Sequence, residues 1–178
     1  MLKYNVRKLK KFLNPFDLAV IGGGAAGFMT AITAAENGVK RIIILEGTSR
    51  LLEKVRISGG GRCNVTNATW VPNELAENYP RGGIQLIESF NRFAAGDVFD
   101  WFHQRGLKLK IEEDQRVFPV SNSSLDVIDC LKKNAIARNI EISKKFFVKE
   151  IFKNTENLFK IFSRENKIIF SKNIILST

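Results

Sequence analysis

The apolar residues of this chain recur in short runs and at helical spacings, and this pattern predicts alternating strands and helices. Residues 18–21 and 41–45 are apolar runs with the length and β-branched character of buried strands. The alanine-rich segment between them is predicted to be a helix that ends just before Gly38, because glycine is favoured directly after a helix. The order strand, helix, strand predicts a βαβ unit and a parallel sheet.

The middle of the chain is predicted to be a long loop followed by helices. Residues 47–67 follow neither spacing, and residues 70–81 carry two prolines, so irregular structure with at most one short helix is expected there. A short strand over residues 107–111 and a turn or extended piece over residues 116–119 come later. Two helices before them are expected from the helical spacing of Ile84, Ile87 and Phe90 and of Val98, Trp101 and Phe102.

The last third of the chain is predicted to hold one helix and a meander of strands. Ser123 and Asp126 resemble a capping box at the start of the helix. Residues 146–152, 158–163 and 167–171 predict three antiparallel strands, and residues 173–176 a separate final strand. The expected fold class is therefore α/β, with a parallel sheet and an antiparallel β-meander.

The composition fits one globular domain of ordinary size. The chain has 178 residues, 44% of them hydrophobic and 26% charged. Residues 1–16 are basic and lack the apolar segment of a secretory signal, so we interpret them as a short, partly disordered leader, with a membrane-surface helix as the alternative. The two cysteines, Cys63 and Cys130, form no C-x-x-C pair, which favours a reducing, cytoplasmic location.

The net charge of +10 would suit either a nucleic acid or a small anionic ligand. Basic residues are spread along the sequence, and aromatic residues do not interleave with them as a base-stacking platform requires. We therefore favour a cofactor pyrophosphate and a small-molecule substrate, and expect neither a nucleic-acid nor a membrane partner.

Three glycines follow the first strand with the spacing G-x-G-x-x-G. In dinucleotide-binding folds, such glycines allow a tight turn, close approach of the backbone to a pyrophosphate, and close packing of the next helix on the strand. Gly22, Gly24 and Gly27 stand at these positions, and the helix after them can point its free amides at phosphate oxygens. An ordinary buried βαβ unit with a glycine-rich turn is the alternative.

Glu46 ends the second predicted strand, about 20 residues after the glycines, where a carboxylate accepts hydrogen bonds from ribose hydroxyls. A carboxylate here would repel a ribose phosphate. The pattern thus favours FAD or NAD over NADP.

A second glycine-rich loop lies in the sequence KVRISGGGRCNVTN, residues 54–67. Its three successive glycines expose backbone amides that can hold an anion or lie against a planar ring. Arg62 adds a permanent charge with forked donors. Two such loops favour an extended ligand, and FAD is long enough to reach both.

These motifs together resemble a known family. The start DLAVIGGGAAG, Glu46, the sequence ISGGGRCNVTN of residues 57–67 and the sequence RVFPVSNSSLDVIDCL of residues 116–131 are similar to the BaiN/YhiN-type flavoproteins, which are bacterial FAD-dependent oxidoreductases. The similarity extends over almost the whole chain after the leader. It implies that residues 17–178 are a Rossmann-like FAD/NAD(P)-binding domain, truncated before the substrate domain.

The resemblance also implies which residues contact the cofactor. The first loop and its helix contact the pyrophosphate, and the acid contacts the adenosine ribose. The second loop contacts the ribityl chain and the flavin, and a strand of the meander contacts the adenine. The residues so implied are Gly22, Gly24, Ala25, Ala26, Gly27, Glu46, Gly47, Ser58, Gly59, Gly60, Gly61, Arg62, Cys63, Asn64, Val148 and Thr178.

The chain departs from the family pattern in two places. Members of the family continue with a substrate domain and a return segment after the position of Thr178, so the resemblance implies an incomplete domain that binds FAD weakly and turns over little or nothing. Leu52 and Glu53 stand where many members carry a glycine and then a basic residue.

Few single side chains point to catalysis. Cys63 could serve redox chemistry, but a packing role under the flavin is favoured, and Cys130 is expected in the core. A structural role is favoured for His103. Arg116 and Ser121 either close over the flavin or only fold their loop. No catalytic pair or metal cluster can be assigned, which is compatible with an enzyme whose chemistry is that of the flavin.

The leading hypothesis is the FAD-binding portion of a flavin-dependent oxidoreductase, with NAD(P)H as a candidate reductant and an unidentified organic acceptor. An NAD-dependent dehydrogenase would explain the first loop and Glu46 but not the second loop. A non-catalytic, truncated nucleotide-binding module and a flavin-dependent RNA-modifying enzyme are two further hypotheses.

Overall fold

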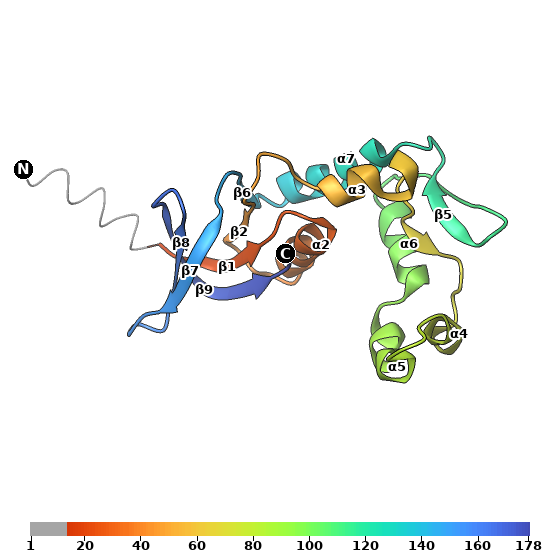
Figure 1. The fold of residues 1–178 in the computed structure, drawn as a ribbon, viewed down its shortest axis with the longest axis horizontal. Coiled ribbons are helices and arrows are strands. Elements are labelled where there is room, and N and C mark those ends of the chain that lie inside the picture. The colour runs from red at the N-terminus through yellow and green to blue at the C-terminus, as the bar shows by residue number, and fades with distance from the viewer. Residues whose placement is uncertain (1–13) are drawn as a thin grey trace, which may run out of the picture. The chain divides into compact units, whose positions relative to one another are not determined.

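A computed structural model describes residues 14–178, which divide into two compact units (Figure 1). One unit combines the chain up to Glu53 with Leu131–Thr178, and the other is Lys54–Cys130. Most of the predicted leader, residues 1–13, lies outside the described residues. The first strand begins at Phe16, which is buried, so the ordered domain starts at or before this residue.

The first unit is built on a six-stranded sheet in the order β6-β2-β1-β9-β8-β7. Strands β6, β2, β1 and β9 are parallel neighbours, and β8 and β7 continue the sheet as antiparallel neighbours. The elements of this sheet and its first helix are β1 (Phe16–Ile21), α2 (Ala25–Glu36), β2 (Ile42–Leu45), β6 (Glu141–Ser143), β7 (Val148–Lys153), β8 (Phe159–Ser163) and β9 (Ile168–Leu176).

Strand β9 joins the two halves of the sheet. Its first part pairs antiparallel with β8 and its second part parallel with β1, and Ser171 takes part in both pairings. The prediction of two separate strands here is wrong. Lys172 and Asn173 interrupt the apolar pattern, but both bind Asp17, through an ion pair of 2.7 Å and a hydrogen bond of 3.0 Å to its carbonyl, so the strand continues.

Apolar side chains hold the first unit together on both faces of the sheet. One cluster joins β1 and β2 to the meander, with Ala19, Leu45 and Ile161 almost fully buried. Phe28 and Ile32 of α2 are also fully buried, and the small Ala31 beside them lets the helix lie close to the strands. Burial of these residues fixes where β1 ends and α2 begins.

The second unit contains short helices and a three-stranded antiparallel sheet in the order β3-β5-β4. The two predicted central helices and the capped helix are confirmed, whereas the predicted loop over residues 47–67 is partly wrong because it contains helical turns and a short strand. The elements are α3 (Glu53–Ile57), the 3₁₀ turn η1 (Ser58–Gly61), β3 (Thr66–Asn67), α4 (Pro72–Glu77), α5 (Gly83–Arg92), α6 (Ala95–His103), β4 (Leu109–Ile111), β5 (Arg116–Pro119) and α7 (Ser124–Ala137).

Helices α3 and α7 contain the boundaries between the units. Within residues 14–178, no helix has the length and apolar character needed to cross a membrane.

Candidate dinucleotide-binding site

The first glycine loop, residues 22–27, is packed so tightly that two of its glycines exclude any side chain. A Cβ on Gly27 would lie 1.9 Å from the Gly22 carbonyl oxygen, and a Cβ on Gly22 would lie 2.5 Å from the Ser177 carbonyl oxygen. Gly22 also has a φ of +119°. These contacts show why the turn from β1 into α2 requires glycine at both positions.

The start of α2 leaves its amide donors open. Gly24 is the residue before the first helical turn and has no side-chain cap, and the two following residues, Ala25 and Ala26, are exposed. Nothing lies within 4 Å of the position that a Cβ on Gly24 would take. The first amides of a helix have no partner within the helix, so this end can bind an anion such as a pyrophosphate.

The Glu46 carboxylate lies beside this loop and organises it. Its Oε2 accepts a hydrogen bond from the Gly23 amide at 2.9 Å, and its Oε1 accepts one from the Thr48 amide at 2.7 Å. Burial raises the pKa of Glu46, but the hydrogen bonds from Thr48 and Gly23 outweigh it and leave the pKa below its usual value. The carboxylate is therefore charged at neutral pH, and its remaining lone pairs can accept ribose hydroxyls.

Gly23 is a site residue that the sequence motif does not mark. Its amide donates a hydrogen bond to Glu46, and its carbonyl accepts one from the Leu52 amide at 2.9 Å. A Cβ on Gly23 would lie 2.7 Å from the Leu51 side chain. Leu52 itself has a φ of +59°, a conformation that glycine adopts more easily. The middle position of the run GGG, residues 22–24, was the available signal for Gly23.

Gly47 and Val148 lie on two segments that are bonded together. The Phe146 amide donates a hydrogen bond to the Glu46 carbonyl at 2.9 Å, and the Lys145 amide donates one to the Thr48 carbonyl at 2.9 Å. Val148 is half-buried against the core and pairs with Ser163, at the sheet's edge strand. The predicted adenine contact of Val148 stays a prediction.

The last residues return to the first glycine loop. The Ser177 amide donates to the Ile21 carbonyl at 2.8 Å, and the position of a Cβ on Gly22 lies 3.1 Å from the Thr178 nitrogen. The structure thus brings Gly22, Gly27, Glu46 and Thr178 together in the first unit, and their contacts with a cofactor stay a prediction.

The second glycine loop, residues 58–64, owes its shape to backbone conformation. Gly59, Gly60 and Gly61 have φ values of +55°, +67° and +86°, and Cys63 has one of +61°. The Cys63 amide closes the turn on the Ser58 carbonyl at 3.0 Å, and the Ser58 hydroxyl donates to the Val55 carbonyl at 3.0 Å. Successive left-handed residues of this kind direct amides into one concavity.

Side chains around this loop are held by β5 and its neighbours. The Arg62 guanidinium lies 3.9 Å from the centre of the buried Phe118 ring and donates to Glu112 at 2.7 Å. The neighbours on one side of the Asn64 side chain are acceptors, so its amide nitrogen faces them and donates hydrogen bonds to the carbonyls of Val117 and Thr66. Cys63 is buried, and burial raises the pKa of its thiol against a smaller opposing effect of Ser58. A raised pKa disfavours the reactive thiolate.

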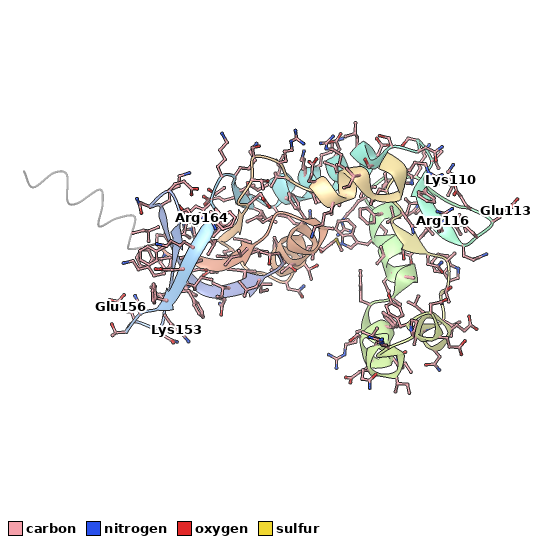
Figure 2. The ribbon with its side chains drawn as sticks, viewed as in Figure 1. Lys110, Glu113, Arg116, Lys153, Glu156 and Arg164 are labelled. Atoms are coloured by element: carbon pink, nitrogen blue, oxygen red, sulfur yellow. The ribbon has the colours of Figure 1, made fainter. Side chains whose placement is uncertain are left out.

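The remaining candidates have structural contacts. Arg116 forms an ion pair with Asp114 at 2.6 Å on the β4–β5 hairpin, where Figure 2 labels it. Ser121 accepts a hydrogen bond from the Ser123 amide, and the exposed His103 stacks on Phe99. Cys130 is buried in α7. Among the described residues, no group of His, Cys, Asp and Glu could hold a metal ion.

Comparison with known proteins agrees with this geometry. The family model described as the HI0933-like protein Rossmann domain matches residues 16–178. The chain is 27% identical over 126 residues to a 3-dehydro-bile acid delta(4,6)-reductase of Clostridium scindens, an alignment that covers 70% of the chain and 30% of the relative. It is 28% identical over 116 residues to a ribosomal RNA dihydrouridine synthase of Escherichia coli K12, covering 65% of the chain and 28% of that relative.

Solved structures show the same fold. The open conformation of a flavocytochrome c3 fumarate reductase superposes with a TM-score of 0.65 at 18% identity, covering 97% of the chain and 36% of that structure. The predicted fold class is thereby confirmed. The chain spans less than a third of the length of the two relatives described above.

Proposed function

Because the chain belongs to the HI0933-like family, we propose that it acts as the FAD-binding domain of a flavin-dependent oxidoreductase. The observation that carries the proposal is the first glycine loop, whose glycines exclude side chains where α2 opens, together with a charged Glu46 fixed beside it. An adenine dinucleotide offers both groups that this arrangement fits, a pyrophosphate and a ribose.

The residues of the chain bind and orient the cofactor. When bound, FAD would supply the redox chemistry, namely electron transfer from a reductant such as NAD(P)H to an organic acceptor. The open amides of Ala25 and Ala26 stabilise the pyrophosphate charge, and Glu46 holds the ribose. In the second unit, the run of left-handed glycines supports the prediction that residues 58–64 contact the flavin, since a peptide without side chains can lie against a ring.

The relatives that this chain matches are much longer than the chain itself. The chain spans 30% of the bile-acid reductase and 28% of the dihydrouridine synthase. We therefore expect the isolated chain to bind FAD weakly and to turn over little or nothing. Its two free, buried cysteines support a reducing compartment such as the cytoplasm.

The test is cofactor binding by the purified chain. FAD and ADP are titrated into the chain by calorimetry, and the visible flavin spectrum is recorded after gel filtration with added FAD. Saturable binding of both ligands is the expected result, with most of the flavin lost on the column because binding is weak. Absence of binding for FAD and ADP alike would overturn the proposal, and binding of NAD in preference to FAD would favour the dehydrogenase alternative.

A second candidate, flavin-dependent modification of RNA, is favoured by one surface. Cross-strand pairing places Lys160 of β8 between Phe152 of β7 and Phe170 of β9, on the face opposite the buried Ile161. Lys160 also lies 4.7 Å from the ring of Phe162, which packs edge-on against Phe152. The expectation that aromatic and basic residues do not interleave is wrong for this meander, because the paired strands place Phe152, Lys160 and Phe170 side by side.

Such a surface has the chemistry of a base-stacking platform. Phe152 is 55% exposed, and residues 141–178 carry eight basic side chains against four acidic ones. One relative acts on ribosomal RNA by its name. Binding of a fluorescent single-stranded RNA should weaken steeply with salt and fall in a Phe152→Ala variant, and no binding at low salt would exclude this candidate.

A further inference from the structure

Phe147 is an aromatic residue placed directly beside the acid that we assign to the ribose. The Phe146 amide donates to the Glu46 carbonyl at 2.9 Å, which aligns the segment before β7 with residues 46–48. Phe146 turns into the core and is 1% exposed, whereas Phe147 is 43% exposed. An exposed phenylalanine on an ordered segment leaves apolar surface that core packing does not use.

The ring of Phe147 occupies the space of a side chain at Gly47. A Cβ on Gly47 would lie 3.0 Å from Cδ2 of Phe147 and 3.6 Å from its Cγ. Gly47 does not have the positive φ that would call for glycine on conformational grounds. A side chain at residue 47 would press against this ring, and Phe147, just before β7, supplies the apolar wall that residue 47 lacks.

Arg164 holds this ring from another side. Its guanidinium carbon lies 3.7 Å from the ring centre, and its backbone amide donates to the Phe147 carbonyl at 2.9 Å. Arg164 follows β8 in a turn closed by the hydrogen bond from the Ser163 amide to the Lys167 carbonyl, and Figure 2 shows it at the end of the meander opposite Lys153. Two backbone hydrogen bonds thus hold the segment that carries Phe147, and a cation–π contact holds its ring.

We infer that Phe147, held by Arg164, forms the wall of the adenine subsite. This inference rests on the proposed function: with the ribose on Glu46, the base extends past Gly47 toward the exposed ring. A flat apolar ring suits a purine base, which stacks on the part of the ring that Arg164 leaves exposed, while the guanidinium holds the ring from its other side. The assignment adds a side-chain contact to the predicted backbone contact of Val148.

The test compares ligands with and without the base. A Phe147→Leu variant keeps an apolar side chain but removes the ring, and ADP and inorganic pyrophosphate are titrated into the full chain by calorimetry. ADP affinity should fall about tenfold, a value within the usual range for losing one stacking partner, while pyrophosphate affinity stays unchanged. Phe147→Tyr should restore ADP affinity. Phe93→Leu, which changes an exposed phenylalanine of the second unit, is the matched control.

The outcomes separate this inference from the proposed function. Unchanged ADP affinity in the Phe147→Leu variant would overturn the inference alone, as would an equal loss of pyrophosphate affinity, which would mean that the first glycine loop is disturbed. A wild-type chain that binds neither ADP nor FAD would overturn the proposed function as well. Arg164→Gln should weaken ADP binding about two- to threefold, because it removes the cation but leaves the ring.

Discussion

The two glycine loops of this chain resemble each other in sequence but need their glycines for different reasons. In the first loop, Gly27 has no space for a Cβ, since one would lie 1.9 Å from a carbonyl oxygen. In the second, Gly60 has open space around it but a φ of +67°. Glycine serves close packing in one loop and a left-handed backbone in the other.

This difference shows how each loop can serve a ligand. The first loop is a packed junction of β1, α2 and the end of β9, so its geometry is fixed before a ligand arrives. The second is a turn whose peptide groups at Gly59 and Gly60 are exposed. A fixed junction is suited to a pyrophosphate, whereas an exposed turn without side chains can lie along a ring.

The largest effect is expected from Gly27→Ala. The new methyl group would overlap the Gly22 carbonyl, so either the turn or α2 must move, at a cost of about 3 kcal/mol or more in unfolding free energy. Chemical denaturation measures the loss, and calorimetry with ADP should show no binding.

Gly24→Ala is the matched control in the same loop. Nothing lies within 4 Å of its Cβ position, and its φ of −87° suits alanine, so stability should stay within about 0.5 kcal/mol of wild type. ADP binding should still weaken, since the methyl group stands at the open end of α2. Equal destabilisation by both variants would refute the idea that packing explains Gly27.

Removing the Glu46 carboxylate should have the next largest effect. Glu46→Ala leaves the amides of Gly23 and Thr48 without their acceptor, and we expect about 2 kcal/mol of lost stability together with weaker ADP binding. Denaturation curves at pH 7 and ADP titrations measure both losses.

The same carboxylate predicts a pH dependence. Its folded pKa lies below the ordinary value of 4.5, so the unfolded chain binds more protons and the stabilisation is complete above pH 4.5. It is lost as the pH falls through the folded pKa. Glu46→Gln should remove this part of the acid dependence, while Glu156→Gln, an exposed acid in the β7–β8 turn, should not.

Within the second loop, Gly59→Ala should destabilise more than Gly60→Ala. Both place alanine at a left-handed φ, which costs about 1 to 2 kcal/mol, but a Cβ on Gly59 would also lie 2.8 Å from the Asn64 nitrogen. Gly60→Asn should recover most of the loss, because asparagine tolerates this conformation. If asparagine gives no recovery in thermal unfolding, then φ is not the reason for glycine at this position.

Much of the first loop could be predicted from sequence because its parts are local. The spacing of Gly22, Gly24 and Gly27 and the distance to Glu46 place strand, turn, helix and acid within 30 residues. The family resemblance and the fold class rest on the same local motifs, and both are confirmed. The position of Phe147 beside Gly47, by contrast, joins segments a hundred residues apart, and no local pattern reveals that contact.

Two wrong predictions involve contacts that the periodicity of the sequence does not show. The continuous strand β9 was predicted as two strands because Lys172 and Asn173 are polar, and only their bonds to Asp17 explain the continuity. The Lys160 and Phe152 surface forms only when β7 and β8 pair. Periodicity identifies elements, but it does not show which residues of paired strands meet.

The smallest effect is expected for the contact that supports the second loop, the pair of Arg62 and Glu112. Both side chains are partly exposed, at 33% and 27%, so a double-mutant cycle of Arg62→Ala and Glu112→Ala should give a coupling of about 1 kcal/mol at low salt and less at high salt. Arg62→Ala alone should lose more than Glu112→Ala, because the guanidinium also covers the Phe118 ring. A coupling near zero, with equal single effects, would mean that backbone conformation alone shapes this loop.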